Sequence, residues 1–472
     1  MHILLINTNR ELRPHPVMPI GMACVAQALE RAGHEVGICD LSFARDPRRA
    51  ITQALRAVQP SLVGLSIRNL DNSSYADPHS YVAELRRIAG FCREGSDAPL
   101  VIGGPAVGVA PRALLAELEA DWAVAGEGEA AATALAGSLE RHVPPAGLAG
   151  VLGAGDTAWA PPAAALTPSL LGNLPRYVDA RPYLRRGAAL PIQTRRGCPF
   201  HCVYCTYPVI EGGAYRLLEP GAVVEEMEQL RQTTGCASFE FVDSTFNVPL
   251  PYAQRLCELL AGRPERLNLQ ATGLSPAQSS PELLQAMRRA GFQTVVCSPD
   301  SAADPVLEGL GKGFTRADLE HMVDWVHQAG IVTLWSFLFG GPGETEASVR
   351  DTLRFIARRL SARDLVLIAA GLRIYPGTPL ERLARAEGMV APEDDLLQPR
   401  FYLSPHLSAG QLKRIFAADL PDIRNCIFIS DLQHGVIPWL ERGFTALGVP
   451  PPLWRYAPYL RRLPHHSHIL PG

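Results

Sequence analysis

Short apolar runs alternate with amphipathic segments twice along this 472-residue chain, and this alternation limits its fold more than any other feature. Buried strands that are separated by helices form parallel sheets, because a parallel connection needs a crossover of helix length. In the first series, strands are expected at about residues 2–6, 34–41, 61–67, 99–104 and 121–126, with helices at about 20–33, 50–58, 80–93 and 111–119. The first third of the chain is therefore predicted to be a Rossmann-like α/β domain with helices on both faces of its sheet.

The second series begins at residue 191 and repeats the strand–helix unit six times. Its strands are expected at about 192–196, 238–243, 267–272, 294–298, 332–339 and 365–373, and its helices at about 220–234, 251–262, 281–290, 315–329 and 345–360. Six units are enough for a partial barrel but not for a closed barrel of eight. In both kinds of sheet, ligands bind at the carboxyl ends of the strands.

These two series divide the chain into four parts. Residues 1–143 are expected to form the first domain, and 191–394 the partial barrel. Residues 144–190 are rich in Pro, Ala and Gly without a sustained period, which indicates a linker or strap. Residues 395–472 have a weaker pattern and are expected to help form the substrate pocket.

Charge and hydropathy narrow the range of partners. Lys and Arg number 44 and Asp and Glu 47, so the net charge of −3 makes a nucleic-acid partner unexpected. Apolar runs stay well short of the roughly 20 residues that span a bilayer, so no membrane association is expected. The N-terminus lacks the pattern of a signal peptide, which favours a cytoplasmic protein. Clustered cysteines in that compartment more often bind metal than form disulfides.

Three of the ten cysteines lie together directly after a predicted strand. Cys198, Cys202 and Cys205 follow the pattern Cys-x3-Cys-x2-Cys. Three thiolates on one loop can hold three irons of a 4Fe–4S cluster and leave the fourth iron open for a ligand. A zinc site or three unconnected core thiols are the alternatives. The other cysteines are expected in the core, at 24, 39, 92, 236, 257, 297 and 426.

The cysteine loop, placed at the start of a six-fold βα series, resembles the radical S-adenosylmethionine (SAM) superfamily. FVDSTFN (241–247), CSPDSAADPVLEGLGKGF (297–314), FLFGGPGET (337–345) and YPGTPL (375–380) are similar to later strand ends of that family. The resemblance implies that the open iron chelates SAM. It also implies SAM contacts from Tyr204, from Asp243 and Ser244 in place of the family's Gly-Gly-Glu motif, and from Ser298 and Asp300 at the ribose.

The first domain resembles the cobalamin-binding domain that precedes many radical SAM barrels. PIGMACVAQALERAGHEV (19–36), VGLSIRNLDNS (63–73), VIGGP (101–105) and AGEGEAAA (125–132) carry the resemblance. The residues expected to contact cobalamin are small or acidic residues at strand ends: Ser66, Gly103, Gly104, Gly126 and Glu127. The family's histidine ligand motif is not expected at Asp77-Pro-His79, and His15 is interpreted as a surface loop residue. A Rossmann-like domain without ligand is the alternative.

The resemblance predicts a cobalamin-dependent radical SAM enzyme that methylates an unactivated carbon of a small molecule through a 5′-deoxyadenosyl radical and methylcobalamin. A reductant such as flavodoxin or ferredoxin is implied. A radical dehydratase, cyclase or rearrangement enzyme is the alternative, and a non-catalytic metal-binding module is a remote one. Outside the cysteine loop, Arg195 and Arg196 are interpreted as either anion contacts or ion-paired residues. Glu344 is expected to cap a helix, and His465, His466 and His468 to be solvated.

Overall fold

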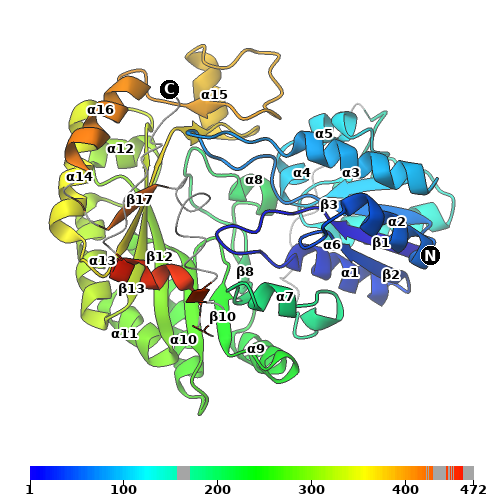
Figure 1. Ribbon diagram of the computed structural model, residues 1–472, viewed down its shortest axis with the longest axis horizontal. Coiled ribbons are helices and arrows are strands. Elements are labelled where there is room, and N and C mark those ends of the chain that lie inside the picture. Colours follow the sequence, from blue (N-terminus) through cyan, green and yellow to red (C-terminus); the bar gives the residue numbers. More distant parts are fainter. Residues whose placement is uncertain are drawn as a thin grey trace.

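The computed structural model describes residues 1–156 and 171–420, and beyond these residues 423, 425–428, 443–444, 447, 449 and 451–460. Two α/β units lie side by side, each with its own sheet (Figure 1). The predicted histidine tail at 465–468 falls outside the described residues. Among the helices that are described, none combines the length and the apolar character that crossing a bilayer requires.

The N-terminal unit is a six-stranded sheet in the order β2-β1-β3-β4-β5-β6. Its strands are parallel except for β6, which pairs antiparallel with β5. The five parallel strands are the five that the sequence predicts, and β6 comes from the predicted linker. The bounds are β1 His2–Asn7, β2 Glu35–Asp40, β3 Leu62–Ser66, β4 Leu100–Gly103, β5 Trp122–Val124 and β6 Val151–Gly153.

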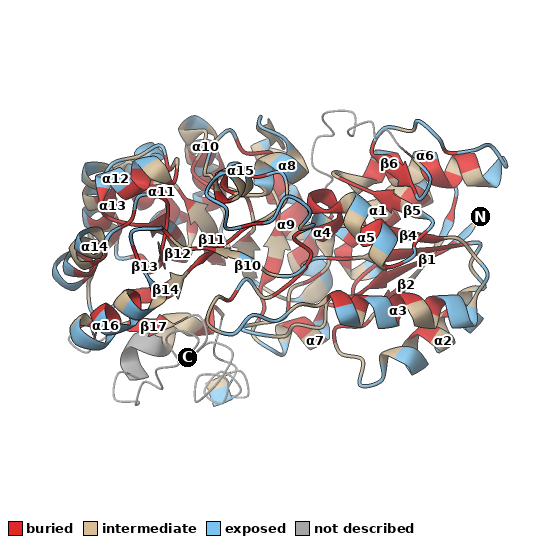
Figure 2. Cartoon of the chain, turned by 90° about the horizontal axis from the view of Figure 1, so that it is seen from above, coloured by how far each residue is buried: buried red, intermediate tan, exposed pale blue. Residues whose placement is uncertain are grey.

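Helices cover both faces of this sheet, as expected for strands that are apolar on both sides. In β1, Ile3 and Leu5 pack on the side of α1 (Ile20–Arg31) and α6 (Gly128–Glu140), while Leu4 and Ile6 pack on the side of α2 (Pro47–Val58) and α3 (Val82–Gly95). The short helices α4 (Pro105–Val109) and α5 (Pro111–Glu117) follow β4. Figure 2 shows the buried strands and the alternation of buried and exposed residues along the outer helices.

The second unit is a curved sheet of seven parallel strands in the order β17-β14-β13-β12-β11-β10-β7. Six come from the predicted series, and the seventh, β17, comes from the C-terminal region and pairs with β14. The bounds are β7 Leu190–Ile192, β10 Ser238–Phe241, β11 Asn268–Leu274, β12 Phe292–Asp300, β13 Val332–Phe339, β14 Leu365–Ala370 and β17 Cys426–Phe428.

Helices line the outer face of this sheet, and Figure 1 shows them as a layer around it. Their bounds are α9 Pro220–Thr234, α10 Leu250–Ala261, α11 Pro281–Ala290, α12 Asp304–Gly309, α13 Arg316–Ala329, α14 Glu346–Arg359 and α16 Ala409–Asp419. Phe241, Phe246 and Phe292 pack against one another in the core between sheet and helices, with ring centroids 5.0 to 5.4 Å apart. Part of the inner face of the sheet meets the N-terminal unit, since Glu240 on β10 contacts His15.

Smaller elements complete the fold. The predicted strand at 192–196 is interrupted, because β8 (Arg195–Arg196) leaves the sheet and pairs antiparallel with β9 (Arg216–Leu217). The predicted linker contains η1 (Leu174–Arg176) and α7 (Arg181–Leu184). The C-terminal region contributes β16 (Phe401–Tyr402), which pairs with β15 (Leu372–Arg373). The remaining elements are α8 Tyr207–Glu211, α15 Pro379–Ala386, η2 Pro276–Gln278 and η3 Leu453–Leu460.

Candidate active site at the domain interface

The cysteine loop lies between β8 and α8, at the carboxyl end of the curved sheet. Cys198 is buried, Cys202 and Cys205 are partly buried, and all three are free thiols. The amide of Cys198 donates to Gly212 O at 3.0 Å, and that of Cys205 to Cys202 O at 3.1 Å. The three thiols are close enough to interact electrostatically, and burial raises the pKa of Cys205 to about 11.

This donor set fits an iron–sulfur cluster better than a single metal ion. Among the described residues, no three His, Cys, Asp or Glu side chains converge on one point where a lone ion would sit. In a 4Fe–4S cluster each thiolate binds a different iron, so three thiolates spread along one loop can bind three of the four irons.

A close backbone contact at Gly311 holds the cysteine loop against the barrel. Gly311 follows α12 with φ +66°, and a Cβ on it would lie 2.5 Å from the carbonyl oxygen of His201. Only glycine permits this approach without displacement of the loop. The amide of Val203 donates to Leu310 O at 3.0 Å, and Val203 O accepts from Leu380 N at 2.9 Å. The loop is thus bonded to α12 and α15.

Tyr204, a predicted SAM contact, belongs to a buried network. Its hydroxyl donates to Asp300 Oδ2 at 2.5 Å, and Lys312 Nζ lies 2.7 Å from the same oxygen. Lys312 also donates to Ser298 O at 2.9 Å. Burial disfavours the ammonium, but the Asp300 carboxylate outweighs it and holds the pKa of Lys312 well above its usual value. Lys312 was not singled out from the sequence, and only its place in Gly-Lys-Gly signalled it.

Asp243 and Ser244 are also bound within the protein. Asp243 is fully buried and accepts from Thr194 N at 2.7 Å, from Thr194 Oγ1 at 2.7 Å and from Arg195 N at 3.2 Å. Arg195 Nε lies 3.5 Å from its carboxylate. The hydroxyl of Ser244 donates to Gly197 O at 2.9 Å. Both side chains therefore brace the segment that leads into the cysteine loop, whereas the side chain of Ser298 is exposed.

Glu344 has a different role from the helix cap that the sequence suggested. Thr345 caps α14, and the Glu344 carboxylate turns back to accept from Gly340 N and from Gly341 N. Glu344 is fully buried, and this burial raises its pKa to about 7. Its other oxygen has no hydrogen-bond partner among the described residues. The carboxylate thus shapes the turn after β13.

The small residues at the strand ends of the N-terminal sheet make backbone contacts within that sheet and its loops. Ser66 O accepts from Thr8 N at 3.2 Å, and Gly103 O accepts from Ile67 N at 2.8 Å. Gly104 has φ +102°, and a Cβ there would lie 2.5 Å from Ile67 O. The close approach of the Ile67 backbone therefore accounts for a glycine at position 104 without a ligand.

Glu127, a predicted cobalamin contact, instead pairs with arginines of the barrel unit. Its carboxylate contacts Arg216 Nη2 and lies 3.5 Å from Arg196 Nη1. Arg196 Nη2 lies 2.6 Å from Glu129, and both of these side chains are buried. Gly126 precedes this cluster with φ +80°. These ion pairs connect the start of α6 to β8, directly before the cysteine loop, and to β9, which follows the loop and α8.

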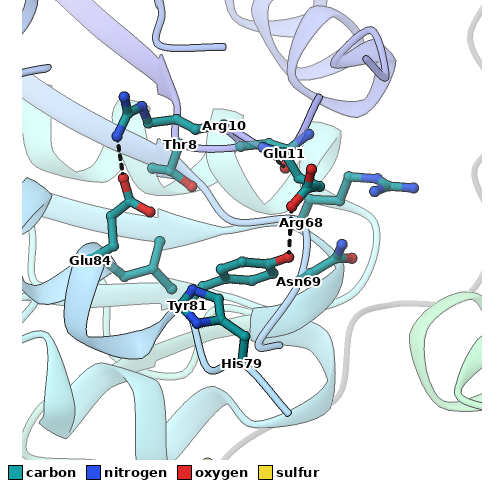
Figure 3. Close-up of a pocket in the computed structure, with 10 residues that line it drawn as sticks. Thr8, Arg10, Glu11, Arg68, Asn69, His79, Tyr81 and Glu84 are labelled. Carbon is teal, nitrogen blue, oxygen red and sulfur yellow. Dashed lines mark hydrogen bonds and ion pairs between the residues drawn. The ribbon is translucent and has the colours of Figure 1, made fainter. Parts of the chain in front are cut away.

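A polar pocket of about 280 Å³ opens where β1 and β3 end (Figure 3). Arg10 contacts Glu84 at 2.5 Å, and the Tyr81 hydroxyl donates to Glu11 at 3.4 Å. Figure 3 shows the guanidinium of Arg68 turned away from these pairs. The other labelled side chains are Thr8, Asn69 and His79. Amide, guanidinium and carboxylate groups at one strand-end edge suit an amide-fringed macrocycle such as a corrin.

His15 is not a free surface residue. The loop between β1 and α1 extends across to the barrel (Figure 1), and His15 Nε2 lies 3.8 Å from Glu240 Oε2 on β10. The carboxyl ends of both sheets are therefore joined by this loop as well as by the ion pairs of Glu127 and Glu129.

Two family models match separate parts of the chain. The B12 binding domain matches residues 9–136, and the radical SAM superfamily matches residues 192–356. The chain therefore carries a B12 binding domain ahead of a radical SAM domain. The predicted family and fold class are thereby confirmed.

Curated relatives of this chain include methyltransferases. The chain is 28% identical over 444 residues to tryptophan 2-C-methyltransferase of Streptomyces laurentii, with 79% of this chain and 73% of the relative covered. It is 28% identical over 387 residues to an uncharacterized methyltransferase of Pyrococcus horikoshii, with 79% of each covered. An anaerobic magnesium-protoporphyrin IX monomethyl ester cyclase of Synechocystis is 25% identical over 360 residues, covering 71% of this chain and 68% of the relative.

Solved structures show the same fold. The radical SAM methyltransferase TsrM of Kitasatospora setae, solved with tryptophan and a SAM analogue, superposes with a TM-score of 0.86 at 24% identity, covering 97% of each chain. The cobalamin-dependent SAM radical enzyme OxsB superposes with a TM-score of 0.68 at 17% identity, covering 85% of this chain and 64% of that one.

Proposed function

We propose that this protein is a cobalamin-dependent radical SAM methyltransferase that acts on a carbon of a small molecule. The observation that carries the proposal is the joining of the two strand-end edges: the segment before the cysteine loop is ion-paired to the start of α6 through Arg196 and Glu129. A B12 binding domain and a SAM domain held edge to edge can serve one substrate between them. The methyltransferases among the relatives, tryptophan 2-C-methyltransferase included, support methyl transfer.

The residues proposed to hold the cluster are Cys198, Cys202 and Cys205. Tyr204, Asp300 and Lys312 hold the loop in place, and Asp243 and Ser244 brace its entry. Ser298, whose side chain is exposed at the end of β12, is proposed as the ribose contact. Cobalamin is proposed to lie over the ends of β1, β3 and β4, beside Ser66, Gly103 and the polar pocket.

When bound, the cluster and SAM supply one-electron cleavage of a sulfonium, and cobalamin supplies a carrier for a methyl group. The chain's own part is placement. Burial raises the pKa of Cys202 above its ordinary value, and the Lys312 ammonium opposes this rise while Asp300 adds to it. A flavodoxin or ferredoxin is proposed as the reductant.

A cyclase or rearrangement enzyme is the second candidate, because a cyclase is among the relatives. The two functions differ in product and in SAM use. A methyltransferase consumes a second SAM to restore the methyl group on the cobalamin, whereas a cyclase returns an unmethylated product.

The test is anaerobic reconstitution of the full chain with iron, sulfide and hydroxocobalamin, followed by desalting and assay of SAM with a reductant. About four irons and one cobalamin per chain, with a product 14 Da heavier when L-tryptophan or a related small molecule is supplied, would support methyl transfer. Iron without retained cobalamin would overturn it.

A further inference from the structure

Two polar side chains lie next to each other on the inner face of the curved sheet. Glu240 on β10 and Gln270 on β11 are register partners on neighbouring parallel strands, so their side chains share one face. Phe239 and Phe241, on either side of Glu240, are fully buried in the core with the outer helices. Glu240 therefore points to the opposite, inner face, which is confirmed by its contact with His15 of the N-terminal unit.

The protein leaves this pair largely unsatisfied. The only ion pair of Glu240 among the described residues is with His15, at 3.8 Å, although the side chain of Glu240 is only 17% exposed. Next in the same row, Thr294 on β12 is fully buried and its hydroxyl has no hydrogen-bond partner among the described residues. Carboxylates and hydroxyls withdrawn from water are costly unless a partner is supplied.

The other half of the inner face is apolar. Leu334 on β13, Leu365 and Leu367 on β14 and Ile427 on β17 form a cluster, against which Val296 and Trp454 also pack. This cluster is already buried and Trp454 packs against it, so the carboxylate and the amide are the groups on the inner face that remain to be satisfied. A ligand that satisfies them carries a nitrogen that donates hydrogen bonds.

We propose that Glu240, together with Gln270, binds a protonated amine of the substrate and so selects amine-bearing small molecules. The proposal deepens the methyltransferase function proposed above and rests on it, because the amine is taken to belong to the molecule that is methylated. Two basic side chains of the N-terminal unit face the carboxylate, His15 directly and Arg68 at longer range. An ammonium that approaches from the inner face replaces the loose His15 contact with a direct one.

The test measures binding without turnover. Full-length reconstituted protein is dialysed at pH 7.5 against three matched pairs of probes: tryptamine and tryptophol, phenethylamine and phenethyl alcohol, hexylamine and hexanol. Each pair differs only in an ammonium or a hydroxyl. Because charge-assisted hydrogen bonds are stronger than neutral ones, at least one amine should bind about tenfold more tightly than its alcohol. Glu240→Gln should bring the two members of that pair to within about twofold.

The controls separate this proposal from the function on which it rests. Glu94→Gln, the same change at an exposed residue of α3, should keep the preference for the amine. Glu240→Asp should keep a reduced preference, and the iron content and cobalamin absorbance of all variants should equal the wild type. If no amine is preferred, or if Glu240→Gln keeps the preference, the proposal is wrong. Failure of methyl transfer in the wild type would overturn the proposed function but leave this preference measured.

Discussion

Asp71, in the loop after β3, lies with its Oδ2 atom 2.7 Å from Nε of Arg373 in β15, and both side chains are buried. The pair joins two residues 302 positions apart, one in each unit. Arg373 also donates to Leu396 O at 2.7 Å and to Ile374 O, so its guanidinium is well satisfied. Together with Arg196 and Glu129, this pair fixes how the two strand-end edges face each other.

Removal of one partner of this pair should be strongly destabilising. We expect Asp71→Asn or Arg373→Met to lower the free energy of unfolding by about 3–5 kcal/mol, because an uncompensated buried charge remains. Denaturant unfolding measures the change. Glu94→Gln, which breaks the exposed Arg48–Glu94 pair, should cost less than about 1 kcal/mol. Equal effects of the two changes would show that the Asp71–Arg373 pair does not hold the units together.

The elements of both sheets were predictable because their signal is local. Each strand of the two series is a short apolar run, and each helix between them has its own period, so five parallel strands and six barrel strands follow from sequence alone. The seventh barrel strand, β17, was missed because it has three residues and is far from its partner β14 in sequence. Nothing local marks a short edge strand of this kind.

The cysteine loop was predictable for the same reason, since its ligands are contiguous. The roles of polar residues depend on partners that only the fold brings close. Asp243 was expected at SAM, yet Thr194 and Arg195 occupy its oxygens. Glu127 was expected at cobalamin, yet it faces Arg216 from 89 positions away. Lys312 and Glu240 went unnoticed because their neighbours come from other strands and, for Glu240, from the other unit.

Stability should fall as the pH rises through the range that Glu344 governs. Its folded-state pKa of about 7 lies above the ordinary value of about 4.5, so the unfolded chain releases this proton first as the pH rises. The contribution of protonated Glu344 to the free energy of unfolding is complete below about pH 4.5. It is lost as the pH rises to about 7, and the loss is about 3 kcal/mol at most. Denaturant unfolding of wild type and Glu344→Gln from pH 4.5 to 8 measures this. The advantage of the wild type over the variant should shrink with rising pH, and a constant difference would contradict the assignment.

A methyl group at Gly311 should disturb the cysteine loop. Gly311→Ala places a Cβ 2.5 Å from His201 O, and we expect it to lower both stability and the iron retained after reconstitution. Gly388→Ala is the matched control, because Gly388 has a similar φ of +71° but open space around it. That control should cost only the backbone strain of about 1–2 kcal/mol and keep the iron. Iron loss in both variants would point to general destabilisation.

Loss of one loop thiol should remove the cluster and leave the fold. We expect Cys202→Ala, like Cys198→Ala and Cys205→Ala, to retain little iron after reconstitution, because each thiolate binds a separate iron. Cys257→Ala is the control, since this thiol lies fully buried in α10, far from the loop in sequence. Its loss should cost about 1 kcal/mol of stability through a small cavity and leave the iron content unchanged. Iron per chain and the visible absorbance of the cluster distinguish the two classes, and a Cys202→Ala variant with full iron would exclude the loop as the cluster site.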